Sequence, residues 1–182
     1  MKLLRVDMDQ LLVKWEPVPA IYERLGGRAL IARLLLEEVP ATCDALGPHN
    51  KLIVAPGLLG GWSVSAAGRL SVGGKSPLTG GVKEANAGGT AGDALGRLDI
   101  KAIVVEGQPA RNNWHILYIH GDAAELLSAG DVQGLGTYAT SDRLQARFGP
   151  DSSVISIGQA GESLMCGAGV CVTGEGNQRS NH

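Results

Sequence analysis

Three short segments in the middle of the chain decide the fold class: KLIVA at residues 51–55, RLSV at residues 69–72 and ANAGGTAG at residues 85–92. The first two are apolar runs flanked by proline or glycine, which is typical of strands. The third begins a run of small residues that predicts a short helix over residues 88–98. Glycine makes up 27 of the 182 residues, about twice its average usage of about 7%, and twelve glycines lie between residues 57 and 96. This density indicates either backbone that approaches a ligand closely or several tight turns.

The segments on the N-terminal side predict a hairpin followed by a helix. Residues 3–6 and 11–15 are short β-type runs separated by a turn. The spacing of the leucines predicts a helix over residues 28–39, and Pro40 ends it.

The second half of the chain predicts further strands and one helix. Residues 101–106 and 114–120 are expected to pair with each other, and residues 154–157 form the last clear strand. Ser141 is expected to cap a helix that ends at Phe148. Because strands and helices are interspersed without a regular alternation, the chain is expected to be one α+β domain.

Charge and composition exclude several classes of function. Sixteen Lys and Arg residues against 18 Asp and Glu residues give a net charge of −2, whereas binding to nucleic acid or to an anionic membrane needs a basic surface. No apolar run reaches the roughly 18 residues of a membrane span. Charged residues from Lys2 onward do not fit a signal peptide, and three cysteines make no disulfide framework. The chain is therefore expected to be soluble and cytoplasmic.

Two glycine motifs invite a phosphate-binding interpretation. Gly74-Lys75-Ser76 matches the end of a P-loop, but Arg69 stands where that motif needs its first glycine, and Pro77 begins a turn where it needs a helix. Gly88-Gly89 at the start of a predicted helix exposes N–H groups that bind anions, or else lets the helix pack tightly on a sheet. There is no G-x-G-x-x-G, so a Rossmann dinucleotide site is not supported.

The cysteines and histidines do not have the spacing of a metal site. Cys166 and Cys171 lie five residues apart and Cys43 is distant, whereas a four-iron cluster takes four thiolates. His115 and His120 are also five residues apart, which places them on opposite faces of a strand. Neither a zinc site nor a nucleophile with its base is predicted.

Six ordered blocks of sequence carry a more specific signal. The chain resembles the N-terminal domain of the aldehyde ferredoxin oxidoreductase family, the tungsten- or molybdenum-pterin enzymes. The resemblance begins at Leu3 and runs almost to the end of the chain. Its blocks are NKLIVAPGLLG (50–60), GR (68–69), KSPLTG (75–80), ANAGG (85–89), AIVVEG (102–107) and IGQAGE (157–162). The resemblance implies an α+β fold with two mixed β-sheets and a few helices, as one domain over residues 1–182 that is truncated at its C-terminal end.

The same resemblance implies a function. In this family the N-terminal domain forms the base on which a bis-pyranopterin cofactor of tungsten or molybdenum sits, and two helical domains close over it. The complete enzyme oxidises aldehydes to carboxylic acids by electron transfer through a 4Fe-4S iron–sulfur cluster to ferredoxin. The implied partners are the remaining helical domains, or a separate chain that carries them, and ferredoxin. Because the cluster ligands and catalytic groups belong to those later domains, we expect this chain to contain no catalytic residue and to be inactive alone.

Four residues carry over from the family as cofactor contacts. Arg69 matches the arginine that lies between the pterin and the iron–sulfur cluster, and its fixed charge suits anionic groups. Asn86, Ala87 and Gly88 match the segment that approaches the pterin phosphates. In that segment the asparagine carbonyl helps to hold a bridging magnesium ion, so Asn86 is the implied metal ligand.

Departures from the family pattern keep alternatives open. The usual Gly-Pro-Leu-Thr-Gly-Thr is here GLLGGW at residues 57–62. Lys75 and Ser76 have either a supporting electrostatic role or a role in turn and sheet packing. One alternative is a non-catalytic truncated or split module that folds and docks on a partner without binding metal alone. Another is a phosphate-ligand binder that uses residues 74–76 together with residues 88–89.

Overall fold

Strands and helices follow one another in the irregular order that the sequence predicts. The computed structural model describes residues 1–110, 113–174 and 179–181. Its strands are β1 (Lys2–Asp7), β2 (Leu12–Pro17), β3 (Lys51–Pro56), β4 (Leu70–Lys75), β5 (Val82–Ala87), β6 (Ile100–Glu106), β7 (His115–His120), β8 (Ala123–Ser128), β9 (Ile155–Ser156), β10 (Cys171–Thr173) and β11 (Arg179–Asn181). Its helices are α1 (Gly27–Glu38), α2 (Ala91–Arg97), α3 (Thr137–Phe148), α4 (Gln159–Glu162) and a 3-10 turn at Ala20–Tyr22.

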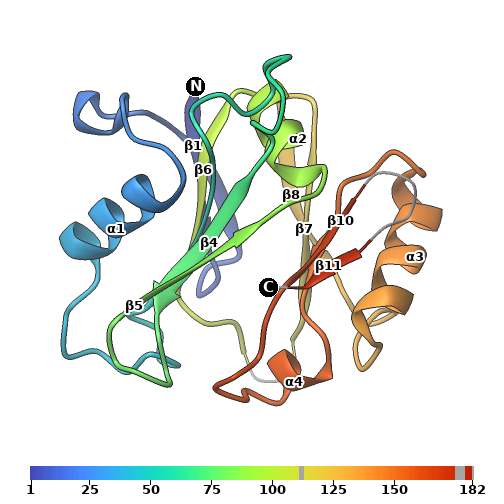
Figure 1. Ribbon diagram of the computed structural model, residues 1–182. Helices are drawn as coiled ribbons and strands as arrows, with labels where there is room; N and C mark the ends of the chain where they lie inside the picture. The colour runs from blue at the N-terminus through green and yellow to red at the C-terminus, as the bar shows by residue number, and fades with distance from the viewer. Residues whose placement is uncertain (111–112, 175–178, 182) are drawn as a thin grey trace.

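The largest sheet has six strands in the order β2-β1-β6-β3-β4-β5. Its β1 and β6 are parallel neighbours, and its other described neighbours are antiparallel. The remaining described strands form a three-stranded sheet, β11-β10-β9, and the pair β7-β8. Figure 1 shows α1 and α3 on opposite sides of the molecule with the sheets between them. The α+β prediction is confirmed, and the described strands form three sheets where the family resemblance implied two.

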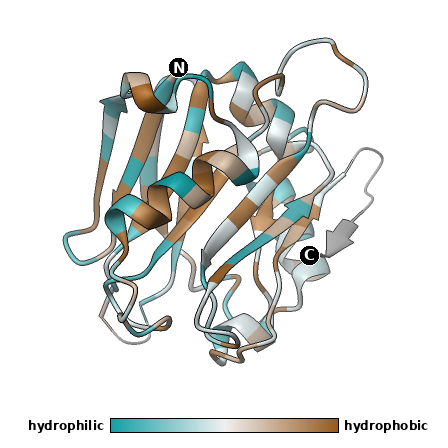
Figure 2. Cartoon of the chain, turned by 60° about the vertical axis from the view of Figure 1, so that its left-hand side comes forward, coloured by the Kyte–Doolittle hydropathy of each residue, from teal (hydrophilic) through white to brown (hydrophobic). Residues whose placement is uncertain are grey.

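Both faces of the six-stranded sheet are buried. On one face α1 contributes Leu30, Ile31 and Leu34, each fully buried against the strands. On the other face the core includes Leu95 of α2 and Val172 of β10. Figure 2 shows hydrophobic and hydrophilic residues sharing α1, and hydrophobic segments recurring along the strands. Burial of side chains on both faces holds the β3–β4–β5 edge of the sheet in place.

The helix α1 spans the sheet from one end of β3 to the other. Its first residue, Gly27, faces Ser71 of β4, and its last residue, Glu38, lies close to Lys51 at the start of β3. The helix agrees with the prediction over residues 28–39. No helix in the described ranges has the length and apolar character that crossing a membrane requires.

One predicted strand pairing is wrong. Residues 101–106 form β6, but β6 lies between β1 and β3, and β7 pairs with β8. The first five residues of β6 are buried, which suits a central strand better than a hairpin arm. The strands β7 and β8 are joined by two residues, and Gly121 has a positive φ of 54°, as a tight hairpin turn favours.

Two further local expectations need correction. The helix α3 begins at Thr137 after Gly136, so Ser141 does not cap it and lies fully buried inside the helix. The Thr140 N–H donates to the Gly136 carbonyl oxygen at 2.9 Å, so the first helical turn closes before Ser141. The strand β5 was not expected, because its sequence VKEANA has little β-propensity.

Candidate functional site

The β4–β5 hairpin brings together residues that are 17 positions apart in the sequence. Arg69 directly precedes β4, Asn86 lies near the end of β5, and the antiparallel register pairs Leu70 with Ala87. Arg69 Nε donates to Asn86 Oδ1 at 2.5 Å, and Nη2 lies 3.4 Å from the main-chain oxygen of Asn86. The Arg69 side chain is exposed. Of the four residues that the family resemblance singled out, Arg69, Asn86 and Gly88 are at least partly exposed and share one surface, whereas Ala87 is buried.

Gly88 contributes main chain to this surface, whereas Ala87 does not, because the whole residue is buried. The Ala87 side chain is fully buried in the core. A Cβ added at Gly88 would have one heavy atom within 4 Å, Arg69 Nη1 at 3.6 Å, so the described structure leaves space there for a side chain. The residues present thus fit a phosphate group, because a guanidinium lies beside main chain that nothing described covers.

The neighbouring glycines have a different explanation. Gly89 has a φ of 103°, and a side chain there would collide with the main chain of Thr173. A Cβ at Gly92 would lie 2.8 Å from the carbonyl carbon of Gly68. Tight packing therefore accounts for Gly89 and Gly92, whereas Gly88 faces open space.

An open cavity of about 420 Å³ lies beside Arg69. Gly26 and the first residues of α1 (27–29) line one side of it, and Gly57, just after β3, also lines it. The β4–β5 hairpin supplies four polar side chains to the lining: Arg69, Ser71, Glu84 and Asn86. We call this cavity the α1–β4–β5 pocket.

The polar side chains of the α1–β4–β5 pocket form one chain of hydrogen bonds. Beyond the contact between Arg69 and Asn86, Asn86 Nδ2 lies 3.4 Å from Ser71 Oγ. Ser71 Oγ donates to Glu84 Oε1 at 2.7 Å. Arg28 Nε, at the start of α1, donates to Glu84 Oε2 at 2.9 Å. An arginine therefore lies at each end of this series of hydrogen bonds, Arg69 at one end and Arg28 at the other.

Lys75 and Ser76 lie at the far end of β4 from Arg69. Lys75 Nζ donates to the carbonyl oxygens of Ala41 and Cys43, at 2.6 and 2.5 Å. Ser76 Oγ accepts hydrogen bonds from main-chain N–H groups of the next turn. Turn and sheet packing therefore explains both residues. The hypothesis of a phosphate site built from residues 74–76 and 88–89 is wrong, because the two segments stand at opposite ends of the hairpin.

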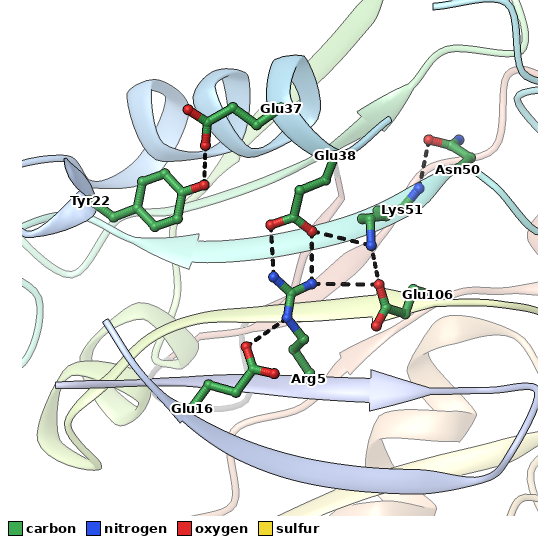
Figure 3. A network of polar contacts seen from close by, with 8 residues as sticks. All are labelled: Arg5, Glu16, Tyr22, Glu37, Glu38, Asn50, Lys51 and Glu106. Atoms are coloured by element: carbon green, nitrogen blue, oxygen red, sulfur yellow. Dashed lines mark hydrogen bonds and ion pairs between the residues drawn. The ribbon is translucent and has the colours of Figure 1, made fainter. Parts of the chain in front are cut away.

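A second polar cavity, of about 330 Å³, lies at the other end of β3. Beside it, Arg5 contacts the carboxylates of Glu16, Glu38 and Glu106, and Lys51 contacts those of Glu38 and Glu106 (Figure 3). Burial raises the pKa of Glu38, but hydrogen bonds and charges from Arg5 and then Lys51 outweigh it, so the pKa lies below its ordinary value. Two cations are shared among three carboxylates in this network, which joins α1 to the sheet through Glu38.

The cysteines and histidines are dispersed. Cys43 is partly buried, Cys166 exposed and Cys171 buried, and all three are free thiols. His115 and His120 lie at the two ends of β7, as the strand prediction implies. Within the part of the chain that the structure describes, no three or more His, Cys, Asp or Glu side chains are grouped to hold a metal ion.

The loop that departs from the family pattern lies beside the pocket. It begins at Gly57, and its Leu58, Leu59 and Trp62 side chains are exposed. The main chain of its Gly60 and Gly61 packs directly against the glycines of α2. The loop therefore presents apolar side chains to solvent from a backbone that is held in place.

The sequence pattern did not indicate a place in the pocket for three polar residues that line it: Arg28, Ser71 and Glu84. Glu84 and Asn86 share a face of β5 because they are two residues apart, but this strand was not predicted. Arg28 follows Gly26-Gly27 at a helix start, the same pattern that drew attention to Gly88-Gly89. The same pair of glycines before a helix could therefore have indicated Arg28 as a candidate.

Several known proteins similar to this chain belong to one enzyme family. The family model described as aldehyde ferredoxin oxidoreductase, N-terminal domain, matches residues 3–181. Tungsten-containing aldehyde ferredoxin oxidoreductases of Thermococcus kodakarensis and Pyrococcus furiosus are 38% and 37% identical over 158 residues, 86% of this chain and 24% of each relative. That of Pyrococcus abyssi is 35% identical over 176 residues, 95% of this chain and 29% of the relative.

A solved structure agrees with these relatives. The active site complex BamBC of benzoyl coenzyme A reductase, in complex with 1,5-dienoyl-CoA, superposes on the whole chain with a TM-score of 0.91 and 26% identity, over 27% of its own chain. The chain spans about a quarter of the length of the first curated relatives that it matches.

Proposed function

Because the chain belongs to the aldehyde ferredoxin oxidoreductase family, in which it matches the N-terminal domain, we propose that it forms the protein surface beneath a tungsten- or molybdenum-pterin cofactor. The observation that carries the proposal is the exposed surface where Arg69 meets Asn86 beside the open main chain at Gly88. The curated relatives named above are tungsten-containing enzymes, which supports the metal class.

Each residue of this surface has a defined task in the proposal. The Arg69 guanidinium binds an anionic edge of the cofactor through donors that Asn86 does not use. The main-chain carbonyl of Asn86 would supply an oxygen ligand for the magnesium ion that the family resemblance implies beside the phosphates. Gly88 lets the phosphates approach the main chain. When bound, the cofactor supplies the two-electron chemistry, and this chain binds and orients it.

The complete reaction belongs to an assembly larger than this chain. We include in the proposal the oxidation of an aldehyde to a carboxylic acid, with electrons leaving through a 4Fe-4S cluster to ferredoxin. The remaining domains, on the same or a separate polypeptide, would supply the cluster ligands, and the chain alone would be inactive. The cytoplasm is the proposed compartment, since it keeps thiols reduced and three free thiols suit it.

The alternative of a module that docks without holding metal predicts a different metal content. The chain is co-expressed with a polypeptide that carries the remaining domains, and tungsten and molybdenum are measured in the purified complex. The proposed function predicts metal in the wild-type complex and its loss in Arg69→Ala and Gly88→Val. A metal-free wild-type complex would favour the docking module.

A matched glycine variant controls for folding. Gly130→Val also adds a side chain where a Cβ would meet only Ser128 Oγ, at 3.7 Å, but lies after β8, away from the pocket. Its complex is expected to keep wild-type metal content. Full metal content in both Gly88→Val and Arg69→Ala would refute the site assignment.

A further inference from the structure

The start of α1 carries a charge that helix energetics alone do not favour. Gly26 caps the helix without a side-chain hydrogen bond, and the first turn contains no acidic residue. Arg28 stands there instead, although the N-terminal end of a helix is its positive pole and disfavours a cation. Local conflicts of this kind are expected at functional positions.

Arg28 is held over the α1–β4–β5 pocket by Glu84. The Glu84 side chain is only 10% exposed, whereas the Arg28 side chain is 76% exposed. Among the residues that the structure describes, Nε is the only guanidinium nitrogen of Arg28 that contacts an acceptor. The outer nitrogens of the guanidinium therefore remain available at the rim of the pocket.

Glu84 itself is fixed from the other side. Its second carboxylate oxygen accepts the Ser71 hydroxyl, and the same hydroxyl links through Asn86 to Arg69. One continuous chain of contacts thus sets the positions of Arg28 and Arg69. The pocket has two guanidinium groups and the positive end of α1 against a single carboxylate, so its net local charge favours an anion.

We propose that Arg28 is a second cationic contact for the phosphate-bearing ligand that binds at Arg69, and that Glu84 is its positioning residue. This inference rests on the proposed function, because it concerns the same pocket. Each guanidinium presents a planar fork that matches phosphate oxygens, so the ligand chemistry is a diphosphate or a pair of phosphates that reaches both arginines. Loss of Arg28 would leave the Glu84 carboxylate facing the phosphates without its counter-charge.

The test uses the 182-residue chain and inorganic pyrophosphate as the probe. The side-chain Nε–Hε NMR signals of Arg28 and Arg69 are followed during titration and are expected to shift along one common binding curve. Arg33, on the same helix and paired with Glu37, is the internal reference and should not shift. Orthophosphate, which has one phosphate group where pyrophosphate has two, should bind more weakly.

Variants separate ligand binding from a structural ion pair. Arg28→Ala should weaken pyrophosphate binding about tenfold, the size of one charge-assisted hydrogen bond. Adding Glu84→Gln to Arg28→Ala should restore part of that loss, because it removes the uncompensated charge. Arg33→Ala should bind like the wild type. A purely structural Arg28–Glu84 pair would instead give full restoration, because Arg28 would then act only by neutralising the Glu84 carboxylate.

The outcomes distinguish this inference from the function on which it rests. Shifts at Arg69 alone, or unchanged affinity in Arg28→Ala, would overturn the role of Arg28 and leave the proposed function standing. Shifts at neither arginine would count against both. Because the wild-type titration needs no substitution, the inference remains testable even where a variant fails to fold.

Discussion

At the scale of single residues, Glu38 shows how the charged network at the end of β3 contributes to stability. Its pKa is lowered because hydrogen bonds and charges from Arg5 and Lys51 outweigh the effect of burial. A carboxyl whose pKa is lower in the folded state stabilises the fold above its unfolded pKa, and this stabilisation is lost as the pH falls through the folded pKa.

Glu38→Gln should therefore lower the free energy of unfolding by about 2 kcal/mol at neutral pH, and by progressively less as the solution is acidified. Urea denaturation at several pH values measures the difference. Glu125→Gln, which removes an exposed contact with His120, should change stability by less than about 1 kcal/mol. An effect of Glu38→Gln that does not vary with pH would contradict the assigned role.

Tyr22 is expected to make the stability of the fold depend on pH in the alkaline range. Burial, followed by a hydrogen bond to Glu37, raises its pKa from 10 to about 12. A group whose pKa is raised on folding contributes stability below its unfolded pKa and loses it as the pH rises through the folded value. The stability advantage of the wild type over Tyr22→Phe should therefore shrink between pH 10 and pH 12, as measured by urea denaturation. A constant difference would contradict the raised pKa.

At the scale of elements, the parts that could be predicted are those whose signal is local. The leucine spacing predicts α1, and the apolar runs predict β3 and β4. The parallel pairing of β1 with β6 joins residues about 100 positions apart, and no local pattern indicates it. The strand β5 is defined by its pairing with β4, which its own composition does not indicate.

The candidate site likewise depends on pairings between distant residues that no local pattern indicates. Arg69, Asn86, Ala87 and Gly88 came from the family resemblance, because nothing in their spacing places residue 69 beside residue 86. Only the register of the β4–β5 hairpin does so. Glu84 could not be assigned to the pocket until β5 was known to be a strand, since its place follows from the two-residue alternation with Asn86.

The contrast between the glycines of α2 and Gly88 gives a prediction at this scale. Gly92→Ala should lower the free energy of unfolding by about 1–3 kcal/mol, because its Cβ would lie 2.8 Å from the carbonyl carbon of Gly68. Gly88→Ala should change stability by no more than about 0.5 kcal/mol, because it faces open space. Chemical denaturation of both variants measures the difference. Equal destabilisation would show that Gly88 is also a packing residue.

At the scale of the whole molecule, the pocket and the loop beside it form one surface suited to a larger assembly. The chain covers about a quarter of the length of its first curated relatives, which therefore contain much further protein outside the part that this chain matches. Trp62 is 70% exposed on the loop that begins at the edge of the pocket. A large exposed aromatic side chain of this kind is typical of the centre of an interface.

Trp62→Ser should therefore weaken association with a co-expressed polypeptide carrying the remaining domains by about tenfold or more, while the free energy of unfolding of the chain changes by no more than about 0.5 kcal/mol. Leu36→Ser is the matched control, because Leu36 is 77% exposed but lies near the C-terminal end of α1, away from the pocket. Affinity is measured by calorimetry on the purified components. If Leu36→Ser weakened association and Trp62→Ser did not, the remaining domains would cover the α1 face instead, and the pocket would lie outside the interface.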